Sequence, residues 1–427
     1  MKKHILRSLL IVNLFCIHYL AHAQEKKNAV QESIWRATDS IFDKLVQVRR
    51  EFHENPELAG QERKTQETIK KYLLDLGLQV ETEVYGYGVV GILRGAKNGR
   101  KIAWRAEMDA LPNDFPDHSN FKSKVKGVQH GCGHDVHMAI ALGIATVLSK
   151  NKQSLHGTAY FIFQPEEETF VGARKIAETN VFAQLKLDEI YALHVTALPS
   201  GQIMVKPNEM FAYQKEVEIQ FKESLTAEAV KELSSKIRNS LVRTSNNSNP
   251  QDIGSITDPK KGLMHPNTIF GDYLIAEENF RSFSKNDTFH INAELYETDA
   301  SRLKDIIPVI ERTIKDSKYA SELLSVTFRK ENPTVLNDSN LTLEAVQTLD
   351  AIFGKGFITT DYGQIPYFND DFAYFQQKVP GVYFFLGGSN FEKGIIAMNH
   401  SPKFEVDEAC IRIGVSAFSS LLFQRLK

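Results

Sequence analysis

The sequence has few cysteines, no excess of charge of one sign and, beyond Leu20, no apolar run long enough to cross a membrane. Its three cysteines allow at most one disulfide. Lys and Arg total 51 and Asp and Glu total 53, and the net charge of −2 gives no general attraction to nucleic acid or anionic lipid. With 427 residues of ordinary globular composition, the chain can form one large domain and one smaller one. Its partners must therefore be inferred from a local site.

The N-terminus has the pattern of an export signal. Met1-Lys2-Lys3-His4 is basic, and Ser8 to Leu20 is an apolar stretch too short to span a bilayer comfortably. Ala21-His22-Ala23 follows as a cleavage site. We expect residues 1–23 to be removed, which would make the mature protein periplasmic or secreted. An uncleaved membrane anchor is the alternative, and lipidation of Cys16 is a lesser one.

Two cysteines, Cys132 and Cys410, follow the signal. In an exported protein they could form a disulfide. Cys132, however, lies among histidines, which favours metal ligation, and Cys410 lies in an apolar helical pattern typical of a buried thiol.

Strand and helix patterns alternate through the first half of the chain. Strands are expected at Val80 to Tyr85, Gly88 to Leu93, Lys101 to Arg105, Thr158 to Phe163 and Glu189 to His194, and helices at Ile34 to Leu45, Thr65 to Leu76, His137 to Lys150 and Gly172 to Thr179. This alternation predicts an α/β fold with a mostly parallel mixed sheet flanked by helices. In such sheets, sites gather where strands end.

The pattern changes after Gly201. Strands are expected at Glu216 to Phe221, Thr268 to Glu278 and Thr288 to Leu295, and helices at Thr226 to Leu241 and Ala300 to Lys315. This order predicts a small inserted α+β domain, ferredoxin-like, at residues 206–322. Residues 24–205 and 323–427 would then form the larger, catalytic domain.

The most informative string is His130-Gly131-Cys132-Gly133-His134-Asp135-Val136-His137, at the start of a predicted helix. Thiolate and imidazole both bind borderline divalent ions such as zinc. The glycines on either side of Cys132 let the backbone bend close to an ion. So many donors in one short stretch favour a metal site over a merely polar loop.

A second cluster, Gln164-Pro165-Glu166-Glu167-Glu168-Thr169, follows an apolar strand. Adjacent carboxylates repel one another unless cations are near. One could bind metal while its neighbour acts as general base; an acidic, solvated turn is the alternative. His194, His400 and Asp109 are further candidates, although each histidine alone is more often structural.

These strings occur in the order found in a known family. Trp104 to Pro112, the string of Cys132 to His137, Phe163-Gln164-Pro165 with its glutamates, Ala192-Leu193-His194 and His400-Ser401-Pro402 resemble segments of the dinuclear metallopeptidases and amidohydrolases. This is the family of hippurate hydrolase, indole-acetyl-amino acid hydrolase, aminoacylase and carboxypeptidase G. The likeness covers nearly all of the mature chain.

The resemblance implies two divalent metal ions, zinc or manganese, and a role for each matching residue. Cys132 would bridge the ions, and the other ligands would be His134, Glu168, His194 and His400. Glu167 would be the general base, since Gly172-Ala173 fixes the register. Asp109 would also serve catalysis, by orienting a ligand as Asp135 and His137 would.

The inserted domain departs from the family. Relatives have a Gly-Gly-His-Ala-Ala segment after its first strand, whose histidine reaches an active site, often across a dimer. Here Gln220 to Ala227 leads straight into a helix, and only His265 could substitute. Asn267 matches an asparagine of relatives, and Arg281 an arginine that binds the substrate carboxylate. A surface charge is the alternative for Arg281.

The resemblance thus implies a hydrolase that cleaves the amide bond of an N-acyl amino acid or short peptide, with a metal-activated water as nucleophile. The sequence does not decide whether the protein forms a homodimer through the inserted domain. The competing interpretation is a metal- or ligand-binding protein that lost turnover together with the histidine of its inserted domain.

Overall fold

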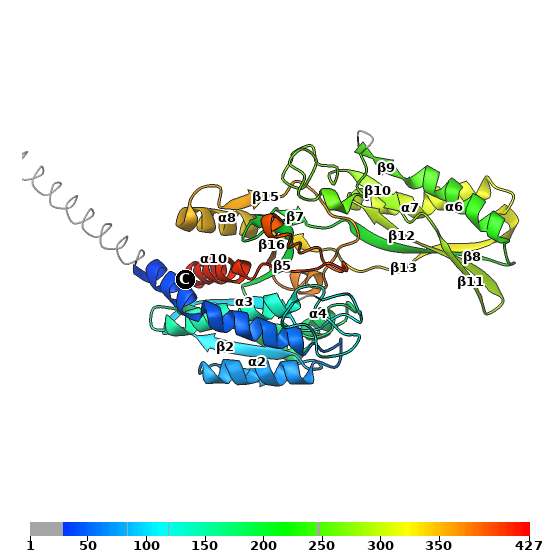
Figure 1. The fold of residues 1–427 in the computed structure, drawn as a ribbon. Coiled ribbons are helices and arrows are strands. Elements are labelled where there is room, and N and C mark those ends of the chain that lie inside the picture. The colour runs from blue at the N-terminus through cyan, green and yellow to red at the C-terminus, as the bar shows by residue number, and fades with distance from the viewer. Residues whose placement is uncertain (1–28, 83, 118, 246–247) are drawn as a thin grey trace, which may run out of the picture.

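A computed structural model describes residues 29–82, 84–117, 119–245 and 248–427 (Figure 1). The predicted signal, residues 1–23 with Cys16, lies outside these ranges. Within them, no helix combines the length and apolarity that a membrane crossing requires.

The larger domain is built on an eight-stranded mixed sheet, in the order β1-β2-β4-β3-β5-β16-β6-β15. Strands β4, β3, β5 and β16 run parallel to one another, and apolar residues fill them because both faces are covered. The predicted α/β class with a largely parallel sheet is therefore confirmed. The strands are β1 (Gln79–Thr82), β2 (Val89–Arg94), β3 (Lys97–Glu107), β4 (His156–Gln164), β5 (Glu189–Pro199), β6 (Ile203–Val205), β15 (Ile358–Thr360) and β16 (Gly381–Ser389).

Helices cover both faces of this sheet. On one face, the helix through residues 29–54 shares an apolar core with α2 (Arg63–Asp75), α3 (His134–Lys150), α8 (Ser339–Phe353) and α10 (Ala409–Arg425). On the other face, a second core includes α4 (Gly172–Ala177), α5 (Asn180–Leu185) and α9 (Ala373–Gln376).

Helix α3 is buried from His134 to Leu148 and lies against α10. A Cβ on Gly143 would lie 2.5 Å from a methyl carbon of Val415, so the two helices meet where there is no room for a side chain. This close contact fixes α3, and with it the string of potential ligands at its start.

The second sheet is antiparallel, in the order β13-β8-β12-β10-β9, with β11 beside β12. Helices α6 (Ala227–Leu241) and α7 (Leu303–Lys315) cover one face of it. Its strands are β8 (Tyr213–Phe221), β9 (Arg243–Thr244), β10 (Tyr273–Ala276), β11 (Arg281–Lys285), β12 (Thr288–Glu297) and β13 (Leu323–Lys330). A short pair, β7 (Asn208–Glu209) with β14 (Leu336–Asn337), lies at the connection to the first sheet.

The predicted boundary of the inserted domain near residue 322 is wrong by one strand. Strand β13 pairs with β8, so the chain leaves the second sheet only after Lys330. A half-buried strand has the same alternating pattern in either sheet, and its partner is not encoded locally.

The strand predicted at Thr268 to Glu278 is shorter in the structure, where β10 covers only Tyr273–Ala276. The residues before it contact the first domain instead. Leu263 and Phe270 belong to a core that the first domain supplies. The backbone N–H of Tyr362 donates to Leu263 (2.9 Å) and that of Gln364 to Phe270 (2.8 Å). A Cβ on Gly363 would lie 2.7 Å from Leu263 and 2.8 Å from Phe270. The two domains are thus joined by packed side chains as well as by connecting strands.

Candidate metal centre

The candidate site lies where β3 and β4 end, beside the first turn of α3. Because Glu107 and Gln164 are paired at the ends of two parallel strands, the segments that follow them lie side by side. Gly133 precedes α3 with a φ of 93°, and a Cβ there would lie 2.3 Å from Val195. Only glycine lets the loop approach β5 so closely.

The structure brings the five expected ligands together. The Sγ atom of Cys132 lies 3.3 Å from Nε2 of His194 and 3.2 Å from Nε2 of His400. The Oε1 atom of Glu168 lies 3.3 Å from Nε2 of His400 and 3.9 Å from Nε2 of His134. Donors on one tetrahedral zinc ion are about 3.3–3.8 Å apart at usual bond lengths, so the spacing suits ion binding. The thiol of Cys132 is thus close to the imidazoles of two other expected ligands.

Cys132 and Cys410 are both buried and both free. The disulfide that the sequence left open is not formed. The thiol of Cys132 is therefore available to the cluster.

Two histidines use Nδ1 to hold their rings and direct Nε2 into the cluster. Nδ1–H of His134 donates to the carbonyl of Asp109 (2.7 Å), and Nδ1–H of His194 donates to that of Val195 (2.8 Å). Within the described ranges, Nε2 of His134 and Oε1 of Glu168 are buried without a hydrogen-bond partner. Buried polar atoms rarely remain so, and a cation would satisfy both.

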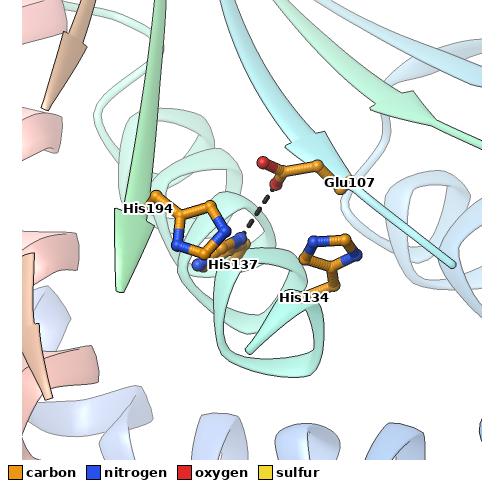
Figure 2. A group of neighbouring side chains, drawn as sticks. All are labelled: Glu107, His134, His137 and His194. Carbon is orange, nitrogen blue, oxygen red and sulfur yellow. Dashed lines mark hydrogen bonds and ion pairs between the residues drawn. The ribbon is translucent and has the colours of Figure 1, made fainter. Parts of the chain in front are cut away.

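His137 lies beside His134, His194 and Glu107, as Figure 2 shows, but both of its ring nitrogens are engaged. Its Nδ1–H donates to Glu107 (2.9 Å), and its Nε2 accepts the backbone N–H of Val195 (2.9 Å). These bonds exclude it as a ligand in this arrangement. His137 instead positions β5 next to His194.

Asp135 points away from the cluster, toward the N-terminal helix. Its carboxylate is fully buried, forms an ion pair with Nε of Arg49 (2.8 Å) and accepts a hydrogen bond from Nδ1 of His53 (2.8 Å). Nε2 of His53 lies 3.0 Å from Asp117. These contacts tie the start of α3 to the rest of the domain.

The three glutamates after β4 form a tight turn. Glu166 has a φ of 56°, the left-handed region that residues with side chains rarely adopt. The backbone N–H of Glu166 donates to Glu62 (2.9 Å), and that of Glu168 donates to Asp109 (2.9 Å). Both residues beside Glu167 are therefore held by buried carboxylates.

Sequence reasoning missed Arg105, an arginine inside the apolar strand β3. Its guanidinium is fully buried and pairs with Glu107, Asp370 and Asp371, at 2.9 Å for the last two. Carboxylate oxygens of Glu167, Asp370 and Asp371 lie within 4.8 Å of one another. A buried arginine demands carboxylate partners, and this was the signal that could have revealed the group.

The cluster carries an excess of negative charge. Burial and the neighbouring carboxylates raise the pKa of Glu167 and also that of the Cys132 thiol. Burial alone would lower the pKa of His134, but its hydrogen bond to Asp109 and the nearby carboxylates raise it to about 10. Divalent cations would compensate this charge and release the thiol proton.

The residues of the second domain do not join the cluster. Asn267 is exposed, and its N–H donates to Nδ1 of His265 (3.1 Å). Arg281 lies on β11, in the sheet that Figure 1 shows apart from α3, and its Nη2 lies 3.6 Å from Glu216 and 3.8 Å from Glu294. The structure thus brings the predicted ligands and base together without the predicted substrate-binding residues.

The site combines sulfur, imidazole and carboxylate donors with a buried glutamate at the strand ends of an α/β domain. This combination is typical of metal-dependent hydrolases. Comparison with known proteins leads to the same class. The sequence profile of Peptidase family M20/M25/M40 matches residues 103–424. The chain belongs to this family and is a hydrolase of amide bonds.

Named relatives support the assignment over nearly the full length. Thermostable carboxypeptidase 2 of Saccharolobus solfataricus is 32% identical over 93% of this chain and 97% of its own. IAA-amino acid hydrolase ILR1-like 4 of Arabidopsis thaliana is 29% identical over 90% of this chain and 86% of its own. Among solved structures, the Bacillus subtilis YXEP protein, described as a dinuclear metal-binding peptidase, matches with a TM-score of 0.72 and 25% identity, covering 91% of this chain and 99% of its own.

Proposed function

We propose that this hydrolase cleaves the amide bond of N-acyl amino acids or short peptides, using two divalent metal ions and Glu167 as general base. The observation that supports this most is the meeting of Cys132, His134, Glu168, His194 and His400, from distant parts of the chain, beside Glu167. The names of the relatives, which include carboxypeptidases and IAA-amino acid hydrolases, favour this substrate class.

Cys132, His134, Glu168, His194 and His400 would hold the ions. Bound ions would lower the pKa of a water and polarise the scissile carbonyl. Thiolate and imidazole suit zinc, whereas manganese prefers oxygen, so we propose zinc before manganese.

Glu167 would accept the proton of the attacking water and return it to the leaving amine. Its Oε2 lies 3.7 Å from Nε2 of His134, so its carboxylate faces the ligand atoms. Because the side chain is buried, the carboxyl has a raised pKa and holds a proton more readily than an exposed glutamate would. Asp109 and His137 would keep the ligands His134 and His194 in place.

We propose Arg281 and Asn267 as substrate-binding residues. The distances of 3.6–3.9 Å from Arg281 to Glu216, Glu277 and Glu294 exceed those of close charge-assisted hydrogen bonds. The guanidinium therefore retains donors for a substrate carboxylate.

The test combines metal content with turnover. Metal per chain and hydrolysis of a panel of N-acyl amino acids and dipeptides are measured with zinc or manganese for wild type, Glu167→Gln and Glu166→Gln. About two ions are expected in each protein. Glu167→Gln should lose about 10²–10⁴-fold in kcat, whereas Glu166→Gln, whose side chain contacts Tyr85, should stay active.

Full activity of Glu167→Gln would contradict the proposal. A finding that the wild-type protein binds no metal would contradict it as well. Wild type that binds two ions but turns over nothing on the panel would favour a binding protein.

Two further properties are proposed from the sequence. Residues 1–23 would direct export, so N-terminal sequencing of the mature protein should begin at Gln24. Light scattering of the purified protein would show whether it forms the homodimer considered above.

A further inference from the structure

The side-chain amide of Asn399 joins two backbone segments at the metal centre. It is 5% exposed, and its Nδ2 donates to the carbonyl oxygens of Cys132 (2.9 Å) and Val195 (3.0 Å). An amide nitrogen has only two hydrogens, so both are used.

Each of these carbonyls belongs to a segment that carries an expected ligand. Cys132 supplies its own Sγ. Val195 follows His194, and its carbonyl also accepts the Nδ1–H that holds that ring (2.8 Å). His400 follows Asn399 directly. The amide therefore links the segment of His400 to the two segments that carry Cys132 and His194.

The segment that carries Asn399 has no helix or strand of its own to place it. His400 has a φ of 55°, and its backbone N–H donates to the carbonyl of Gly131 (3.0 Å). Asn399 and His400 thus bind the consecutive carbonyls of Gly131 and Cys132. Because more than 200 residues separate Asn399 from Val195 and from Cys132, the position of His400 depends on these long-range bonds.

We propose that Asn399 is a positioning residue that sets the separation of the Cys132 thiol from the imidazoles of His194 and His400. This inference rests on the proposed two-ion function. The angle between donors decides how tightly an ion is held, and loss of groups that orient ligands typically costs 10–100-fold in metal affinity.

The chain contains a matched control, Asn337. Its side chain is 1% exposed, and its Nδ2 also donates to two carbonyls, those of Lys206 and Tyr383, both at 3.0 Å. Neither Lys206 nor Tyr383 is next to an expected ligand in the sequence, although the ring of Tyr383 lies 6.5 Å from that of His194. Replacement of Asn337 by leucine removes the same kind of bonds elsewhere in the same domain.

The experiment compares wild type, Asn399→Leu and Asn337→Leu after loading with cobalt(II). The dissociation constant is measured by chelator competition, the absorption spectrum reports thiolate and imidazole coordination, and thermal unfolding reports stability. Asn399→Leu should bind cobalt about 10–100-fold more weakly, with an altered spectrum. Asn337→Leu should lose thermal stability but keep the affinity and spectrum of wild type.

Unchanged affinity and spectrum in Asn399→Leu would overturn the inference and leave the proposed function standing. Equal changes in both variants would overturn it as well, since they would show a general effect of lost stability. Wild type that binds no cobalt would overturn the proposed function and the inference together. If Asn399→Leu does not fold, Asn399→Ser replaces it in the experiment. Serine keeps one donor where the amide has two, and cobalt binding is expected to weaken in this variant too.

Discussion

The carboxylate of Glu62 accepts the backbone N–H of Glu166 at 2.9 Å. Glu62 directly precedes helix α2 and is fully buried. With Asp109, which accepts the N–H of Glu168, it holds the turn on both sides of Glu167. Glu62 therefore acts on the base through the backbone.

Loss of this acceptor should reduce turnover. We expect Glu62→Ala to lower kcat about 10–100-fold, because a small displacement of a catalytic group is costly. Glu62→Gln should stay near wild type, since its amide oxygen can still accept the N–H of Glu166. Steady-state kinetics at saturating metal, with metal content measured alongside, would check this. Equal losses in both variants would contradict a role for the acceptor.

Removal of the Arg105 side chain should strongly destabilise the protein. Arg105→Leu leaves Glu107, Asp370 and Asp371 buried without their cation, which typically costs about 3–5 kcal/mol. Urea unfolding of the metal-free protein would measure the change. Lys71→Ala breaks an exposed ion pair with Asp75 and should change stability little. Similar midpoints for Arg105→Leu and wild type would contradict the prediction.

Asp361, which is not among the expected site residues, should make the stability of the protein depend on pH. Burial, only partly offset by Lys206, raises the pKa of Asp361 to about 7, and within the described ranges its Oδ2 has no hydrogen-bond partner. The native state then binds a proton that the unfolded chain releases near pH 4. Stability should fall as pH rises from about 4 to about 7, by up to roughly 4 kcal/mol.

Asp361→Asn should remove this component. The free energy of unfolding is measured for wild type and Asp361→Asn at pH 5 and at pH 8, at saturating metal. It should decrease less between these pH values in Asp361→Asn than in wild type. Identical decreases would mean that other groups cause the pH dependence.

Arg281 should discriminate substrates by their carboxylate. If it binds that group, Arg281→Ala raises KM about 10–100-fold for an N-acyl amino acid, as expected for loss of a hydrogen bond between charged groups. The same compound with its carboxylate converted to an amide should be much less affected. Equal effects on the two substrates would assign Arg281 to the ion pairs of the second sheet alone.

The expected site residues that local sequence alone could group are those within continuous strings, whereas His194 and His400 were added through the order of the family's motifs. Cys132 with His134, and Glu167 with Glu168, could be recognised because neighbours in sequence remain neighbours in the fold. The string could not show from spacing alone that His134 directs a free nitrogen into the cluster while His137 does not. That difference depends on the backbone N–H of Val195, which lies far along the chain.

Contacts between distant segments account for what was missed. Asp370 and Asp371, which pair with Arg105, and Glu166, which donates to Glu62, lie far from these residues along the chain. The amide of Asn399 bonds to carbonyl groups that any residue type would supply. Strand β13 was assigned to the wrong domain because its pairing with β8 depends on β8 rather than on its own pattern.

Gly363 limits what can change where the two domains meet. It is the point at which Leu263 and Phe270 of the second domain press against the backbone of the first, with no space for even a methyl group. Any larger residue there would have to displace Leu263 and Phe270 from that backbone. The fit of the two domains to each other is therefore sensitive to a single position that supplies none of the expected ligands.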